Sequence, residues 1–240
     1  DTIPKPLVNI GYRPILWNLM RYYAHYGHKE FILCLGYRGD MIKDFFLNYN
    51  ECVSNDFVLS NGGKDIELLN SDIQDWRITF VETGMKSNIG QRLMAVKEHV
   101  QEDEYFLANY SDGLSDLPLD VYLDKFHSTQ ATAGFVGVHT LHSFHAVHAD
   151  DNGMVKRIGS MSSSEILVNG GFFVLKRDIF DYMNDGEELV EEPFQRLIAE
   201  QKLFGYEYNG FWRAMDTFKD KITFDEMHGK GETPWEVWKK

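Results

Sequence analysis

Apolar and polar positions in the first half of the chain follow two alternating periods. Apolar side chains recur at helical spacing over 14–26, between a proline near the start and a glycine after the end, which predicts a helix. The short apolar run 30–35 that follows is typical of a buried strand. The same rhythm predicts helices over 41–49, 91–100 and 117–127 and strands over 77–81, 105–109 and 133–138. This alternation indicates βαβ units and a parallel sheet with helices on both faces.

The second half of the chain is richer in strand patterns. Strands are predicted over 146–147, 155–158, 166–175 and 203–208, and helices over 190–200 and 219–227. A hairpin is predicted over 57–69, where two strand patterns flank a glycine-rich turn. Because no linker-like run separates the halves, we expect one α/β domain over 1–240 with a β-rich elaboration over 139–170.

Composition and charge narrow the function. Of the 240 residues, 43% are hydrophobic and 25% charged, and the net charge is −13. This composition is typical of a globular protein, and this charge disfavours nucleic acid and anionic membranes as partners. The sequence contains no run of 18 apolar residues, so it predicts no membrane span. Cys34 and Cys52 indicate no disulfide framework, which fits a reducing cytoplasm. Phosphate chemistry on so acidic a chain needs a divalent cation.

Two acidic residues follow predicted strands, at the end where ligands bind in open α/β sheets. Asp112 lies in Tyr110-Ser-Asp-Gly113, and Asp216 lies in an apolar and aromatic setting before the last helix. Each has a structural alternative, since Asp-Gly is a common turn and the segment of Asp216 could form a helix cap, with Asp216 or Thr217 as the capping residue. Two carboxylates from distant strand ends are also suited to Mg²⁺, which keeps waters and takes few protein ligands. Asp116 is expected to cap a helix.

A series of short motifs, in order over nearly the whole chain, resembles the glucose-1-phosphate cytidylyltransferases, which belong to the sugar nucleotidyltransferases. The motifs are Pro4-Lys5-Pro6-Leu7-Val8, Pro14-Ile15-Leu16-Trp17, Gly36-Tyr37-Arg38-Gly39, Tyr110-Ser-Asp-Gly113, Asn169-Gly-Gly-Phe-Phe173, Phe211-Trp212, Met215-Asp216-Thr217 and Pro234-Trp235-Glu-Val-Trp238. The resemblance implies a Rossmann-like, mixed and mainly parallel sheet, and a transfer of a nucleotide, with CTP favoured, to a sugar 1-phosphate, with glucose 1-phosphate favoured.

The resemblance also implies roles for individual residues. Lys5 would hold triphosphate oxygens, and Asp112 and Asp216 would bind Mg²⁺. Gly90 would let the backbone approach the base, with Gln91 nearby, although this segment is also a helix start. The attacking sugar phosphate is already an anion, so the protein would supply positioning and charge neutralisation rather than a general base.

On the sugar side, Asn169 and Gly170 would line the pocket, and Glu192 is a candidate for a sugar hydroxyl, although an acid at a helix start also complements the dipole. The chain departs from the family here, since the Glu-Lys-Pro motif of many relatives is not found and Phe144-His145 replaces an aromatic-glycine pair. His145 is expected to contact the sugar. A metal site at His139, His142, His145 and His148 is disfavoured, since strand residues three apart face opposite sides.

Several alternatives stay open from the sequence. The nucleotide could be UTP or dTTP, the acceptor could be another phosphorylated compound, or the chain could bind nucleotide sugars without catalysis. A glycosyltransferase is disfavoured because no Asp-x-Asp pair follows a predicted strand. A homo-oligomer is expected, because aromatic residues crowd the helix 14–26 and the tail around Trp235 and Trp238. We also expect roughly 15–30 preceding residues that form a central strand and a glycine-rich phosphate loop.

Overall fold

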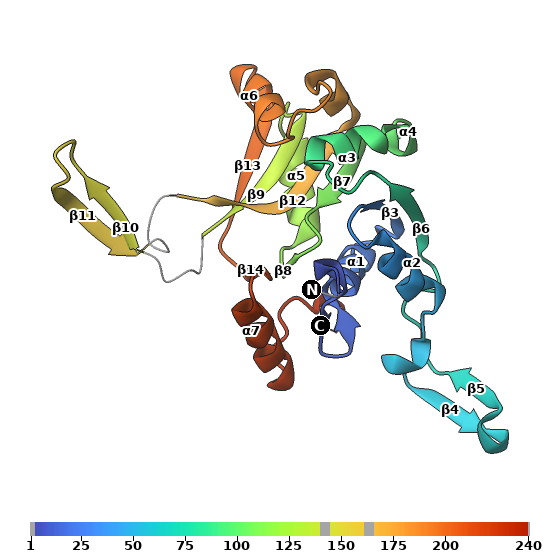
Figure 1. Cartoon of the computed structure of the whole chain (residues 1–240). Coiled ribbons are helices and arrows are strands. Elements are labelled where there is room, and N and C mark those ends of the chain that lie inside the picture. The colour runs from blue at the N-terminus through green and yellow to red at the C-terminus, as the bar shows by residue number, and fades with distance from the viewer. Residues whose placement is uncertain (1–2, 140–144, 161–165, 240) are drawn as a thin grey trace.

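A computed structural model describes residues 3–139, 145–160 and 166–239 of the chain (Figure 1). Four strands form its larger sheet, in the order β13 (Leu203–Tyr208), β9 (Ala133–Val138), β12 (Val168–Lys176) and β7 (Tyr105–Asn109). β13 runs parallel to β9, whereas β12 is antiparallel to both of its neighbours. A second sheet pairs β3 (Glu30–Leu35) with β6 (Arg77–Glu82) in parallel. The fold is therefore α/β with a mixed arrangement of strands, as expected.

The larger sheet is buried on both faces, and β12 shows why. Its side chains alternate between two cores: Phe172 and Val174 belong to one, and Phe173 and Leu175 to the other. The first core includes residues of α1 (Ile15–His25) and α5 (Leu119–His127), and the second includes residues of α3 (Ile89–Ala95) and α6 (Glu192–Ala199). Burial on both faces explains the continuous apolar run that predicted this strand.

The smaller sheet has a separate core, which includes residues of two helices. Leu35 of β3 is buried with Leu16 and Met20 of α1 and with Ile42 of α2 (Gly39–Leu47). Among the described strands, β3 pairs only with β6, and β7 pairs only with β12. Each of these two strands therefore has one edge without a strand partner in the described part of the chain. The expected preceding strand stays a prediction.

The predicted helix over 91–100 is divided in the structure. α3 ends at Ala95 and α4 spans Lys97–Val100, with the non-helical Val96 between them. The last helix is α7 (Phe218–Gly229), and a 3-10 turn spans Val237–Lys239. The predicted strand boundaries at 30–35, 105–109, 133–138 and 203–208 are confirmed.

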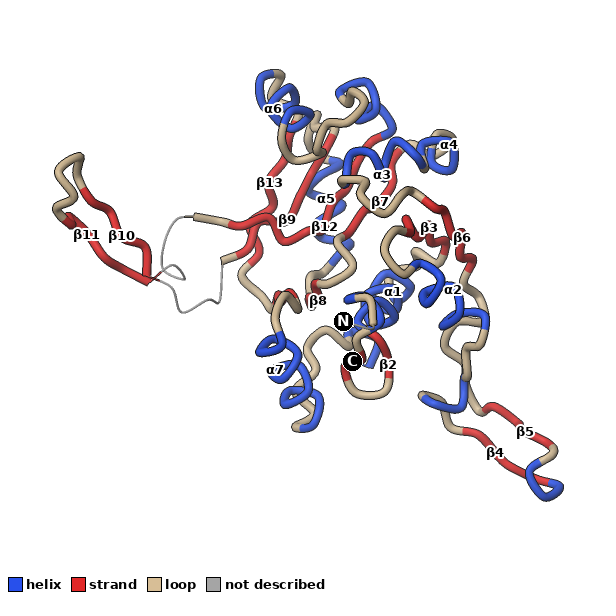
Figure 2. The backbone as a smooth tube through the Cα atoms, viewed as in Figure 1, coloured by secondary structure: helices blue, strands red, loops and turns tan. Residues whose placement is uncertain are grey.

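Among the described residues, three hairpins lie outside the two sheets (Figure 2). The predicted hairpin is confirmed as β4 (Phe57–Ser60) and β5 (Asp65–Leu68), and β10 (His145–Ala149) pairs with β11 (Val155–Ser160). A short hairpin of β1 (Asn9–Ile10) and β2 (Arg13–Pro14) precedes α1 and was not predicted. In Figure 1 the β4–β5 and β10–β11 hairpins both stand away from the larger sheet.

The aromatic residues that motivated the expected oligomer are packed inside the chain. Tyr22 is 1% exposed and Trp235 is also 1% exposed. Trp17 is buried and meets Trp238 edge to face, with ring centroids 5.9 Å apart. The reasoning from surplus aromatic surface was therefore wrong, although the oligomer itself stays a prediction. Within the described ranges, every helix is too short or too polar to cross a membrane.

Candidate active site

A short strand pair brings the two carboxylates together. β8 (Gly113–Ser115) pairs antiparallel with β14 (Trp212–Ala214), with Gly113 opposite Ala214. The backbone pairing continues one step further, because the Met215 amide donates to the Asp112 carbonyl at 2.8 Å. Asp112 and Asp216 therefore lie at the same end of this strand pair, although 104 positions separate them in the sequence. Local sequence patterns did not predict this pairing.

Lys5 lies between the two carboxylates. It begins a 3-10 turn over Lys5–Leu7, next to the buried Pro4. Its Nζ lies 2.6 Å from Asp112 Oδ2 and 2.6 Å from Asp216 Oδ1. Partial burial alone would lower the pKa of the ammonium, but the two carboxylates outweigh it and raise the pKa of Lys5 above its ordinary value. The ammonium therefore stays charged at neutral pH, and the structure brings all three expected residues to one place.

The donor set of this cluster suits Mg²⁺. Asp112 and Asp216 direct oxygen atoms at one cation, here the ammonium of Lys5. Mg²⁺ accepts such oxygen ligands and completes its shell with waters and substrate phosphates, so two carboxylates suffice. Across the described ranges, no group of three or more His, Cys, Asp or Glu side chains is arranged to hold a metal. Two carboxylates thus form a donor set for a metal that also takes waters and phosphate oxygens as ligands.

The backbone of Asp216 is held by the first turn of α7. The Asp220 Oδ2 atom accepts hydrogen bonds from the Thr217 amide at 2.9 Å, the Thr217 hydroxyl at 2.8 Å and the Asp216 amide at 3.2 Å. Thr217 in turn accepts from the Asp220 amide, which completes a capping box. Thr217, not Asp216, is thus the helix cap. Asp220 was missed from the sequence, although Thr217-x-x-Asp220 carries the spacing of such a box.

Asn169 and Gly170 belong to β12 and lie beside the β8–β14 strand pair. The Asn169 amide accepts from the Gly171 amide at 2.9 Å and donates to the Tyr110 hydroxyl at 3.3 Å. The Trp212 Nε1 atom donates to the Gly170 carbonyl at 2.8 Å. A Cβ atom at Gly170 would lie 3.2 Å from that same nitrogen, so the glycine leaves room for the indole. Trp212 therefore joins the ladder to the expected sugar pocket.

Gly90 and Gln91 have structural partners of their own. A Cβ atom on Gly90 would lie 2.1 Å from the Glu187 carbonyl oxygen, so the glycine lets the start of α3 pack on that backbone. The Gln91 side chain accepts from the Asn88 amide at 3.1 Å as part of a capping box. Both residues thus lie in the first turn of a helix, which confirms the helix start that the sequence also predicted. Their roles toward a nucleotide base stay predictions.

The remaining sugar-side candidates are placed less tightly. Glu192 is exposed in the first turn of α6, where its charge acts on Arg196. Burial raises the pKa of the Tyr110 hydroxyl above its ordinary value, and the charge of the Glu188 carboxylate adds to this rise. Glu188 was not predicted as a site residue.

The histidine series begins at the end of β9 and continues into β10. The backbone of His145 begins β10 opposite Ser160. Phe144 and His142 lie outside the described residues, as does the segment 161–165. His139 lies 3.4 Å from the Glu207 carboxylate through its Nε2 atom. The expected sugar contact of His145 stays a prediction.

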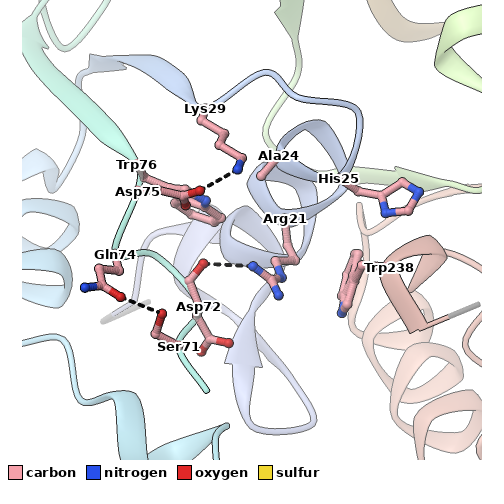
Figure 3. A pocket seen from close by; sticks show the side chains of 10 residues that line it. All are labelled: Arg21, Ala24, His25, Lys29, Ser71, Asp72, Gln74, Asp75, Trp76 and Trp238. Atoms are coloured by element: carbon pink, nitrogen blue, oxygen red, sulfur yellow. Dashed lines mark hydrogen bonds and ion pairs between the residues drawn. The ribbon is translucent and has the colours of Figure 1, made fainter. Parts of the chain in front are cut away.

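A cavity of about 440 Å³ lies elsewhere, beside the second half of α1 (Figure 3). Its cationic residues already have partners: the Lys29 ammonium pairs with the Asp75 carboxylate, and Arg21 donates to the Asp72 carbonyl at 2.8 Å. Lys5, Asp112 and Asp216 are not among its lining residues. This cavity therefore does not contain the candidate site.

Comparison with solved structures finds chains of similar fold. UDP-glucose pyrophosphorylase complexed with UDP-glucose matches with a TM-score of 0.68 at 14% identity, covering 96% of this chain and 92% of that one. HddC from Yersinia pseudotuberculosis complexed with GMP-PN matches with a TM-score of 0.62 at 19% identity, covering 95% and 91%. At these identities the likeness establishes the shared fold.

Comparison of the sequence gives much closer relatives. The probable glucose-1-phosphate cytidylyltransferase of Bacillus subtilis strain 168 is 39% identical over 99% of this chain and 93% of that protein. The glucose-1-phosphate cytidylyltransferase of Salmonella typhi is 36% identical over 98% of this chain and 91% of its own length. No family model matches the chain. Full-length similarity at this level shows that the chain belongs to the glucose-1-phosphate cytidylyltransferase family and is a sugar-1-phosphate nucleotidyltransferase.

Proposed function

We propose that this chain joins CTP to glucose 1-phosphate in an Mg²⁺-dependent reaction that yields CDP-glucose and pyrophosphate. One observation carries the proposal: Lys5 lies within hydrogen-bonding distance of both Asp112 and Asp216. The relatives that match nearly the whole chain are named as glucose-1-phosphate cytidylyltransferases. A cation and two carboxylates at the end of a strand ladder form a site for a metal and phosphate groups.

The reaction is an in-line displacement. An oxygen of the sugar 1-phosphate attacks the α-phosphorus of CTP, and the bond from that phosphorus to the bridging oxygen breaks, so the electron pair leaves with pyrophosphate. Lys5 contacts phosphate oxygens, and Asp112 and Asp216 hold Mg²⁺. The metal supplies neutralisation of the phosphate charge when bound. The attacking oxygen is already anionic, so the protein contributes positioning and electrostatic stabilisation rather than proton transfer.

The sugar is assigned to the side of the ladder where Asn169 and Gly170 lie. Support comes from two contacts: Asn169 donates to the Tyr110 hydroxyl, and Trp212 of β14 donates to the Gly170 carbonyl. Glu192 and His145 are proposed as further sugar contacts. On the nucleotide side, Gly90 and Gln91 are proposed to lie near the base, where the buried start of α3 offers a rigid backbone.

A substrate panel tests the reaction. The chain is incubated with Mg²⁺, one nucleoside triphosphate and one sugar 1-phosphate, and pyrophosphate release is followed. We expect release only when nucleotide, glucose 1-phosphate and Mg²⁺ are all present, with CTP the fastest. Faster release with UTP or dTTP, or with another acceptor, would correct the substrate. Nucleotide-sugar binding without any release would instead identify a binding protein.

Self-association is proposed as well, through the β4–β5 hairpin. Leu59 and Ile66 face each other in its register and are each 57% exposed. Apolar surface of this kind favours a protein interface. Light scattering is expected to give a mass above 27.9 kDa for the chain and a lower mass for Leu59→Ser. A monomeric mass for the unmodified chain at micromolar concentration contradicts this.

A further inference from the structure

The ammonium of Lys5 occupies the position where the two carboxylates converge. It contacts one oxygen of each, at 2.6 Å in both cases. A magnesium ion would need these carboxylates at about 2.0–2.1 Å, and its own charge would repel the ammonium. The two cations therefore compete for the same pair of residues.

The surroundings let the ammonium leave while its backbone stays in place. The Lys5 carbonyl accepts from the Val8 amide at 3.1 Å, which fixes the turn. The Lys5 side chain is 39% exposed and Asp216 is 60% exposed, so water reaches the cluster. Four rotatable bonds let a lysine side chain reorient at modest cost. If Lys5 left alone, however, Asp112 and Asp216 would face each other without a counter-charge.

We propose that Lys5 is an exchangeable counter-ion that keeps the Asp112–Asp216 pair closed to free Mg²⁺ and moves to phosphate when a metal–triphosphate complex binds. The inference rests on the proposed function and adds an order of binding, in which the metal enters the site together with the triphosphate. The metal–triphosphate complex brings a cation for the carboxylates and an anion for the lysine in one event. Free Mg²⁺ brings only the cation, so it binds weakly while the ammonium is in place.

Binding of Mn²⁺, as a paramagnetic substitute for Mg²⁺, tests this without turnover. Free Mn²⁺ is titrated by electron paramagnetic resonance into the chain in the absence of nucleotide. Removing one positive charge next to the metal in Lys5→Met is expected to tighten Mn²⁺ binding by about tenfold. Lys5→Arg keeps the charge and is expected to bind as weakly as the unmodified chain. Adding Asp216→Asn to Lys5→Met is expected to reverse the gain.

Lys29→Met is the matched control. Lys29 pairs with the Asp75 carboxylate and is 44% exposed, so the variant makes the same change in net charge away from the site. Its Mn²⁺ affinity is expected to equal that of the unmodified chain. Equal affinities of Lys5→Met and the unmodified chain, or an equal gain in Lys29→Met, overturn the inference. Circular dichroism checks the fold, and Lys5→Gln makes the same comparison if Lys5→Met does not fold.

The outcome separates this inference from the proposed reaction. If the unmodified chain turns over CTP and the Mn²⁺ affinity of Lys5→Met is unchanged, only the proposed exchange of Lys5 is overturned. Tighter Mn²⁺ binding in that variant, without turnover of any nucleotide by the unmodified chain, overturns the proposed reaction alone.

Discussion

Replacing Asp220 by alanine tests how α7 holds Asp216. Asp220 is only 8% exposed, and its Oδ2 atom accepts from the Asp216 amide, the Thr217 amide and the Thr217 hydroxyl. The other oxygen lies 3.7 Å from the Arg213 guanidinium. In Asp220→Ala the capping box and this ion pair are both lost, and the backbone at Asp216 loses its acceptor.

The expected cost follows from these contacts. Loss of a capping side chain costs about 1 kcal/mol, and hydrogen bonds to a charged acceptor contribute about 1.5–3 kcal/mol. Asp216 and Thr217 are themselves exposed, so water replaces part of what is lost. We therefore expect the free energy of unfolding to fall by roughly 1–2 kcal/mol. Turnover is expected to fall further than stability explains, because the Asp216 amide loses the acceptor that holds its backbone at the start of α7.

Urea unfolding measures the first effect and steady-state kinetics the second. Asp225→Ala on the same helix is the control, because Asp225 is exposed and pairs with Lys221 at the surface. A surface pair of this kind contributes about 0–1 kcal/mol, so this variant is expected to remain close to the unmodified chain in both assays. In a double-mutant cycle, Thr217→Val and Asp220→Ala are expected to be non-additive because they share hydrogen bonds. Equal behaviour of the Asp220 and Asp225 variants would refute the positioning role.

The remaining predictions concern pH, packing and the metal. Hydrogen bonds from Arg196 lower the pKa of Glu187 from 4.5 to about 2, so its stabilisation is complete above pH 4.5 and is lost as pH falls toward 2. Thermal melts of Glu187→Gln and the unmodified chain should therefore converge over that range, and a constant gap contradicts this. Gly90→Ala places a Cβ atom 2.1 Å from the Glu187 carbonyl oxygen, and urea unfolding should show a loss of roughly 1–3 kcal/mol; an unchanged midpoint argues against this packing. Asp112→Asn and Asp216→Asn should each reduce turnover about a hundredfold or more with an unchanged circular dichroism spectrum, and near-normal turnover at low Mg²⁺ would remove that residue from the metal site.

The strands of the larger sheet could be predicted because their signals are local. β7 and β9 are short, mostly apolar runs between turn residues, a pattern typical of strands that are covered on both faces. The direction of β12 could not be predicted in this way. Its pattern is the same whether its neighbours run parallel or antiparallel, and it proves antiparallel to both.

The pairing of β8 with β14 lay outside what local patterns contain. Both strands have only three residues, and their contact joins segments far apart in the sequence. Asp116 shows the same limit, because its expected role as a helix cap was wrong. Its Oδ1 atom accepts from the Tyr208 hydroxyl at 2.5 Å and the Phe211 amide at 2.8 Å, so it holds the turn that leads to β14.

For the candidate site, the sequence supplied the residues and the structure supplied their mutual distances. Acids at strand ends pointed to Asp112 and Asp216 before their contact was known. Lys5 bridges both carboxylates from the 3-10 turn at Lys5–Leu7. No periodic pattern in the sequence predicts this turn. The aromatic residues of α1 were wrongly expected to form an exposed surface. Composition does not show that Trp17 packs against Trp238.

The fate of the C1 oxygen of glucose 1-phosphate tests the central proposal most directly. Glucose 1-phosphate labelled with ¹⁸O at the oxygen between C1 and phosphorus is incubated with CTP, Mg²⁺ and the chain, and the products are identified by mass spectrometry. Attack by the sugar phosphate on the α-phosphorus predicts CDP-glucose that retains the label, formed in equal amount with unlabelled pyrophosphate. Labelled inorganic phosphate, or CTP left intact while glucose 1-phosphate is consumed, would contradict the proposed reaction.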